Sequence, residues 1–310
     1  MNWRMLAAVL FVFACAYGIV SGLRYARSRV GAVAATVVDE IEVSTQPPFE
    51  VARGTRTLPA HRDKRLRIEN TTGSVKVVPG GPGTTAEYVI SARGENEAEA
   101  RRRASAVEVQ VVHIGGEGDR VRVKAQGRMP AGITVDLVVH TAPDSALSVK
   151  TVSASIDVTG MQGDVAVQSV SGEINVGSGA GSVTAHTVSG GIGIVGAQGK
   201  TEARSTSGSV NLANLHSNDI AARTVSGSIE IEVTDPFAGR LEATSVSGGI
   251  AISLPRPSNF QAHATSVSGV ISGAAWQSSV GRKAYARLAS GQGSVTLSTT
   301  SGSIDLTLTD

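Results

Sequence analysis

One short phrase recurs through the second half of the chain and constrains its fold more than any other feature. The phrase consists of a hydroxyl residue, a variable residue, serine and glycine, in that order. Aliphatic residues follow it at alternate positions. A variant of the phrase, Ser153-Ala154, comes first. The full copies contain Ser171-Gly172, Ser189-Gly190, Ser207-Gly208, Ser226-Gly227, Ser247-Gly248, Ser268-Gly269 and Ser301-Gly302. A period near twenty residues indicates a repeat architecture, in which each unit buries its apolar side by stacking on its neighbours.

The spacing of the copies predicts the fold class. The corners at positions 154, 172, 190 and 208 are equally spaced, and the later ones, at 227, 248, 269 and 302, follow at longer intervals. Aliphatic residues stand two and four positions after each corner, as at Ile174 and Val176, and Gly273 is the one break. This period of two is typical of a strand, and a second short strand precedes each corner. We therefore predict an all-β fold, with residues 151–310 forming a parallel β-solenoid, or β-helix, of coils of about 18–21 residues.

The serine that precedes each corner glycine allows two interpretations. A row of serines could be catalytic or could bind a ligand, but a catalytic serine needs one base beside one serine, not eight equivalent copies. The favoured interpretation is structural. A ladder of hydroxyls would satisfy backbone groups at the corners, and the adjacent glycine would supply a conformation that other residues avoid.

The N-terminal segment predicts a membrane partner. Residues 6–23 carry no charge and are long enough for a short span. We predict that residues 1–30 are a transmembrane anchor or a signal segment, with the uncleaved anchor favoured, and that residues 31–60 are a linker. Three arginines after the span, Arg24, Arg27 and Arg29, would by themselves favour a cytoplasmic location for the rest of the chain.

Residues 61–150 are predicted to form a β-rich N-terminal cap, because an open solenoid end would expose its ladder and its core. Residues 66–77 contain a copy of the phrase with Thr72 in place of serine, and the next copy comes only at Ala154. Residues 95–106 lack glycine and proline and predict one short helix, with Glu97 and Glu99 paired one turn away with arginines.

Residues 260–298 depart from the repeat and are the only part of it where aromatic residues and cations gather. One interpretation is a long loop folding over the end of the stack. The other is a partner-binding feature made of Trp276, Arg282, Lys283, Tyr285 and Arg287.

Known chemical motifs do not occur in this sequence. The histidines do not fall at metal-ligand spacings, and no phosphate loop or nucleophile elbow is present. We predict no catalytic residue, no cofactor and no metal. The repeats have no basic stripe with interleaved aromatics, which argues against nucleic acid. A carbohydrate-active enzyme would depend on outward carboxylates such as Asp157 and Glu230, which are three or more coils apart and too far for paired acid–base work.

The repeated corner, together with its N-terminal copy, resembles the bacterial β-strand-repeat family of adhesin-like proteins that is defined by domain of unknown function 4097. The resemblance covers roughly residues 66–310. It implies a β-solenoid, often attached to a membrane anchor and exposed to the cell envelope, and it implies no catalytic residues.

These observations favour one function and leave two alternatives. The favoured function is a membrane-anchored, non-enzymatic and extracytoplasmic β-solenoid, which acts as an adhesin or a cell-envelope scaffold for an unknown protein or cell-surface partner. One alternative is a cytoplasmic-facing scaffold that self-associates end to end. The other is a carbohydrate-active β-helix enzyme.

Overall fold

The computed structural model describes residues 48–60, 64–127, 129–177, 179, 181–280 and 282–310. The predicted membrane segment at residues 6–23 lies outside this part of the chain. Within the described residues, 23 strands and one helix are present, and that helix is too short and too polar to cross a membrane. The prediction of an all-β fold with one short helix is confirmed for these residues.

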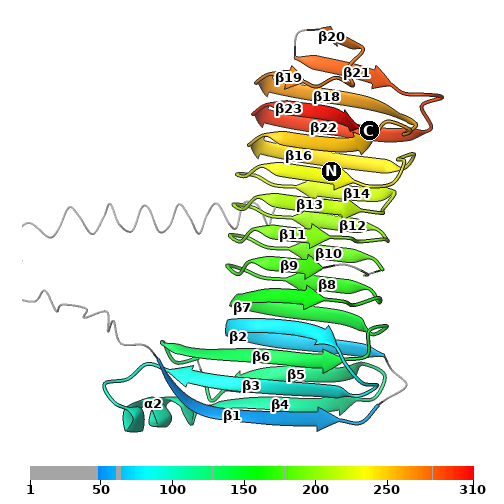
Figure 1. The fold of residues 1–310 in the computed structure, drawn as a ribbon. Coiled ribbons are helices and arrows are strands. Elements are labelled where there is room, and N and C mark those ends of the chain that lie inside the picture. Colours follow the sequence, from blue (N-terminus) through cyan, green and yellow to red (C-terminus); the bar gives the residue numbers. More distant parts are fainter. Residues whose placement is uncertain (1–47, 61–63, 128, 178, 180, 281) are drawn as a thin grey trace, which may run out of the picture. The chain divides into compact units, whose positions relative to one another are not determined.

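The middle of the described chain is a stack of parallel coils (Figure 1). Each coil contributes one strand before its corner and one strand after it. Ile174 pairs in register with Ile156 on one side and with Ile192 on the other. The strands are β7 (Ala146–Thr159), β8 (Val165–Gln168), β9 (Ile174–Gly177), β10 (Val183–His186), β11 (Ile192–Val195), β12 (Thr201–Arg204), β13 (Val210–Leu215), β14 (Asp219–Arg223), β15 (Ile229–Val233), β16 (Arg240–Ser247) and β17 (Ile250–Pro255).

The core lies between the strands that precede the corners and those that follow them. Ile156, Ile174 and Ile192 form one buried column, and Val165 and Val183 belong to a second column across the core. Each buried aliphatic side chain of this size contributes about 1.5–3 kcal/mol through removal of its surface from water. Because the alternate residues face solvent, the period-two pattern in the sequence corresponds directly to the inside and the outside of the stack.

The corners are held by a ladder of buried hydroxyls three positions before each glycine. Ser205 Oγ accepts a hydrogen bond from Gly208 N at 2.9 Å and donates one to Gly190 O of the neighbouring coil at 3.0 Å. The buried column comprises Thr151, Ser169, Thr187, Ser205, Thr224, Ser245, Ser266 and Thr299. The sequence-based interpretation placed this ladder on the serines next to the glycines. Those serines are exposed, because the chain turns outward between the two positions.

The corner glycines are required by close approach of the coils. A Cβ at Gly190 would overlap the carbonyl oxygen of Gly172 in the next coil, and a Cβ at Gly208 would overlap that of Gly190. None of the corner glycines from Gly172 to Gly302 has a positive φ. The expectation that they supply an unusual conformation was therefore wrong, and the cause is the lack of space between coils.

The N-terminal end of the stack is built from segments that are distant in the sequence. Strand β2 (Arg65–Pro79) lies beside β7, with Gly73 opposite Ala154. Two copies of the phrase that are far apart in the sequence are thus neighbours in space. On its other side β2 pairs with two parallel strands, β5 (Gly118–Ala125) and β6 (Ile133–Thr141).

Antiparallel strands and the helix complete this end. They are β1 (Phe49–Leu58), β3 (Thr84–Ala92), β4 (Val107–Ile114) and helix α2 (Glu97–Ala104). Strand β1 pairs with β3 over nearly its whole length, so the described part of the predicted linker, residues 31–60, contains a strand of the cap. In α2, Glu97–Arg101 (2.7 Å) and Glu99–Arg103 (2.8 Å) form the expected ion pairs one turn apart.

The C-terminal end has a different order in space from its order in the sequence. Strand β22 (Gly293–Ser301) lies between β16 and β18 (Phe260–Ser268), and β23 (Ile304–Thr309) lies between β17 and β19 (Ile271–Ser272). The last coil of the chain is therefore the second to last coil of the stack (Figure 1).

A hairpin covers part of the final coil. Strand β21 (Lys283–Arg287) runs antiparallel to both β18 and β20 (Ser278–Val280). The expectation that residues 260–298 form a loop over the end of the stack holds for this hairpin alone, because β18 and β19 form a coil of the stack and β22 lies inside it. Gly273, the break in the aliphatic column, has φ +120°, and a side chain there would overlap Leu306. The chain leaves the strand conformation at this residue to enter the hairpin.

Candidate partner-binding surface

The stack has two outward faces that differ in charge. The name pre-corner face is used for the outward-facing residues of the strands that precede the corners. In their order along the stack, these strands are the first half of β7, then β8, β10, β12, β14, β16, β22 and β18. The outward residues of the strands after the corners form the post-corner face. From residue 154 on, the described post-corner strands contain no lysine or arginine. Their outward charges are all negative: Asp157, Glu230, Glu232 and Asp305.

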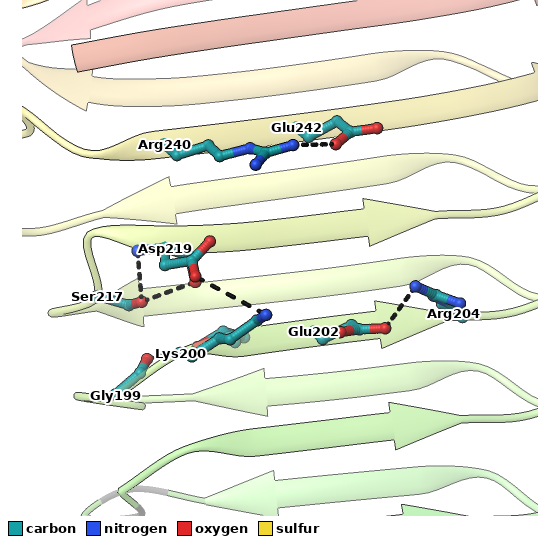
Figure 2. Close-up of polar contacts among 9 residues, drawn as sticks. Gly199, Lys200, Glu202, Arg204, Ser217, Asp219, Arg240 and Glu242 are labelled. Carbon is teal, nitrogen blue, oxygen red and sulfur yellow. Dashed lines mark hydrogen bonds and ion pairs between the residues drawn. The ribbon is translucent and has the colours of Figure 1, made fainter.

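Most charges on the pre-corner face are paired with one another (Figure 2). Arg204 pairs with Glu202 at 2.6 Å, Lys200 lies 3.9 Å from Asp219, and Arg240 pairs with Glu242 at 3.3 Å. Exposed pairs of this kind contribute about 0–1 kcal/mol each to stability. Their main consequence is that the face presents a fixed pattern of charge.

A groove of about 480 Å³ lies on this face, beside the corners of the middle coils. Lys150, Gln168, His186 and Arg204 line it from four coils that follow one another in register. The Nε atom of Arg204 is buried and has no hydrogen-bond partner among the described residues. An unpaired buried donor is uncommon, and this one belongs to a residue that lines the groove.

The surroundings of His186 favour its neutral imidazole. Burial lowers the pKa of its imidazole below 6.5, and the positive charge of Arg204 lowers it further, against a smaller opposite effect of Glu202. The permanent positive charge of the groove therefore comes from Lys150 and Arg204.

Exposed valines line the corners next to the groove, and Thr206 and Thr300 take the place of valine at two of the corners. Backbone bonds such as Ser171 N to Val152 O and Ser189 N to Val170 O hold them coil upon coil. Each is 43–51% exposed, and together they form what we call the valine stripe: Val152, Val170, Val188, Val225, Val246 and Val267. Aligned apolar side chains on a surface mark sites of interaction more often than scattered ones do.

A second groove, of about 470 Å³, lies at the C-terminal end of the same face. The rings of His263 and Tyr285 face each other there, with centroids 4.8 Å apart, and Tyr285 is 45% exposed. Gln277 donates to Arg287 O at 2.7 Å and accepts from Arg287 N at 3.1 Å, which fixes the position of Arg287 beside the tyrosine. Tyrosine and arginine are the residues that most often dominate protein interfaces.

The five residues predicted to bind a partner have different surroundings. Lys283, Tyr285 and Arg287 point outward from β21, alternating with buried alanines, and Tyr285 and Arg287 line the second groove. Trp276 is partly buried and donates from Nε1 to Ser272 O at 2.7 Å, so it covers the end of β19. Arg282 is exposed, and its carbonyl accepts a hydrogen bond from Ser266.

Asp157 and Glu230, the carboxylates considered for a carbohydrate-active enzyme, lie on the post-corner face. The register places them four coil steps apart, through Asn175, Gly193 and Asn211. At the usual strand spacing this is about 19 Å, which is beyond the range of two carboxylates that act on one bond.

Sequence reasoning missed the valine stripe and the first groove. A signal for the stripe was present, since valine recurs between two hydroxyl residues at a turn, where polar residues are expected. The groove had no comparable signal. Lys150, His186 and Arg204 become neighbours only when the coils are aligned, and each looks like an isolated surface residue in the sequence.

Comparison with known proteins gives one family. The model of the Toastrack DUF4097 family matches residues 57–307. No curated protein matches the chain. The family match spans both ends of the stack and all of its middle coils.

Three solved structures are similar over most of the chain. A "putative adhesin" from Bacteroides fragilis shares 12% identity, with 82% of this chain and 97% of that chain covered and a TM-score of 0.47. One from Parabacteroides merdae shares 11%, with 83% and 96% covered and a TM-score of 0.36. A "putative cell adhesion protein" from Clostridium sporogenes shares 8%, with 85% and 100% covered and a TM-score of 0.29.

Proposed function

Because the chain belongs to the Toastrack DUF4097 family, we propose that it is an adhesin-like interaction module without enzymatic activity, which binds a protein or cell-surface partner through its pre-corner face. The observation that carries this proposal is the gathering of both grooves and the adjacent valine stripe on one side of the stack. A partner laid along this side would bury exposed valines and would meet the paired charges of β12, β14 and β16. Apolar contact with charges at its margin is the usual composition of a protein interface.

We further propose that residues 6–23 anchor the protein in a membrane and that residues 46–310 face the extracytoplasmic space. The length of the uncharged run supports the anchor. The arginines that follow it oppose this orientation, so sidedness needs a direct experiment. A C-terminal tag on the full chain should be digested by protease in intact cells, after the outer membrane is opened where there is one. Protection until the inner membrane is permeabilised would contradict the proposal and favour the cytoplasmic scaffold.

Binding on this side of the stack can be tested with matched variants of the valine stripe, which borders the pre-corner face. Cells that display the full chain are compared for attachment to immobilised cell-envelope preparations. The triple variant Val170→Ser, Val188→Ser, Val225→Ser should attach at least about tenfold more weakly. Each substitution removes apolar surface that the partner would cover.

The control carries three changes on the opposite face of nearby coils, Asn175→Ala, Asn211→Ala and Ala251→Ser. It should attach like the unchanged protein. Equal attachment of both variants would contradict binding along the valine stripe, and with it the proposal that a partner lies on this side of the stack. The enzymatic alternative makes a separate prediction, namely turnover of a polysaccharide that disappears in Asp157→Asn or Glu230→Gln.

A further inference from the structure

The C-terminal coil, formed by β22 and β23, is an inserted element. Hydrogen-bonded strands flank it on both sides, β16 and β17 on one and β18 and β19 on the other. Val295, Leu297, Ile304 and Leu306 on this coil are buried in the common core. Every one of its ladder contacts is to residues that come earlier in the chain.

The strands that bound the place of this coil come earlier in the chain than the coil itself. In the folded stack, the edges of β16 and β17 are separated from those of β18 and β19 by this one coil. Their backbone groups and apolar side chains need a partner, because unpaired ladder groups at a sheet edge readily pair with another strand. We call this place the insertion slot; it is bounded by residues 240–255 and 260–272.

The connection to the inserted coil is a short hinge at residues 288–292. Ala289 has φ +53°, a conformation that favours glycine and is strained for alanine. Gly291 has φ +70°, and a Cβ there would lie 2.6 Å from Gln261 Cγ. A short strained hinge favours exchange of the element that it carries, because an extended hinge relieves the strain. Residues 288–292 join β21 directly to β22, so the inserted coil follows the hairpin through this one short connection.

We propose that the C-terminal coil exchanges between copies of this chain, so that the coil of one molecule fills the insertion slot of another. A second copy is the partner that fits, since it supplies the same side chains in the same register. The in-register contacts of Asp305 with Ala251 and Ser272 would form between two chains instead of within one. Reciprocal exchange gives a closed dimer, and one-way exchange gives an open chain of molecules.

The test uses two full-length copies that are expressed together. Both carry Cys15→Ser, which removes the natural cysteine. One copy carries Ala251→Cys and the other Asp305→Cys, positions that face each other in the slot. Parallel neighbours lie within the Cα separation that a disulfide spans. Exchange predicts a disulfide-linked heterodimer after mild oxidation.

Two controls make each outcome decisive. Asp157→Cys and Asn175→Cys, placed in separate copies, face each other on two coils that are consecutive in the chain and joined by a short turn, and they should give no linked heterodimer. A chain that carries both Ala251→Cys and Asp305→Cys should form this disulfide either within one chain or, after exchange, between two copies, because the two positions are neighbours in both arrangements. Closure of this pair without any heterodimer above the Asp157/Asn175 level would overturn the proposal, and so would failure of the pair to close in either way.

The hinge provides a graded readout. Ala289→Gly accepts the positive φ without strain, so the slot should be filled from within the chain more often and the heterodimer yield should fall several-fold. A yield unchanged by Ala289→Gly would contradict the role assigned to the hinge.

Discussion

The middle and the ends of the stack follow different rules. From β7 to β17, each coil lies beside the coil that the chain made just before it, as the pairing of Ile174 with Ile156 shows. At the N-terminal end, β2 meets β7 across an insertion that contains β3 to β6. At the C-terminal end, β22 and β23 enter between coils that are already neighbours in the sequence.

Connection length explains this difference. In the middle, the corner glycines recur at intervals of about 18–21 residues, so each new strand can reach only the open edge of the preceding coil. Where the interval is much longer, from Gly73 to Ala154 and from Gly269 to Gly302, the chain has enough length to leave the stack and return elsewhere. The regular repeat therefore specifies how coils pair, whereas the long insertions decide which coils become neighbours.

The largest expected effect comes from removing equal lengths of chain from the two regions. Deleting residues 293–310 empties the insertion slot and removes four buried aliphatic side chains, worth about 6–12 kcal/mol. Hydrogen exchange should then lose protection throughout β18 to β21. Deleting residues 173–190, which is one complete period, should give a shorter stack that still unfolds cooperatively. Protection of residues 260–287 in the first variant would contradict the inserted position of the last coil.

A smaller effect separates two adjacent glycines in the middle. In Gly190→Ala the new methyl group overlaps Gly172 O, and we expect a loss of about 2–3 kcal/mol, measured by urea denaturation. In Gly191→Ala the nearest atom is Ser209 O at 3.8 Å, and the change should be within about 0.5 kcal/mol. Equal effects of the two substitutions would show that close approach of the coils is not what requires glycine.

The hydroxyl ladder predicts a loss of about 1–2 kcal/mol for Ser205→Ala, since this leaves Gly208 N and Gly190 O without their partner. Ser207→Ala, two residues away and exposed, should leave the free energy of unfolding unchanged. If Ser207→Ala were instead the more harmful of the two, the ladder would lie in the column that the sequence first suggested.

The smallest expected effect is a pH dependence in the middle coils. Because the pKa of His186 lies below 6.5 in the folded protein, protonation favours the unfolded chain. Stability should be full above pH 6.5 and should fall slightly as the pH drops from there toward the folded pKa. His186→Gln should flatten this part of the stability curve. A curve of unchanged slope in the variant would assign the dependence to another group.

Much of the fold follows from the sequence, because alternation and spacing both report local structure. The aliphatic columns, the coil length and helix α2 were predictable for this reason. The order of the coils at the ends was not, since the phrase at residues 299–302 looks like any other copy and carries no mark of where it docks. For the candidate site, Tyr285 and Arg287 could be found from composition. The groove at Lys150 and Arg204 required the register.

The central structural claim is that the last coil of the chain lies between two earlier ones, and three cysteine positions test it directly. In full-length protein with Cys15→Ser, the pair Ala251→Cys and Asp305→Cys should form an internal disulfide on mild oxidation, because these residues are neighbours. The pair Ala251→Cys and Ser272→Cys should remain reduced, since Asp305 lies between them. The reverse result, a disulfide between residues 251 and 272 and none between 251 and 305, would mean that the coils stack in chain order and would contradict the account.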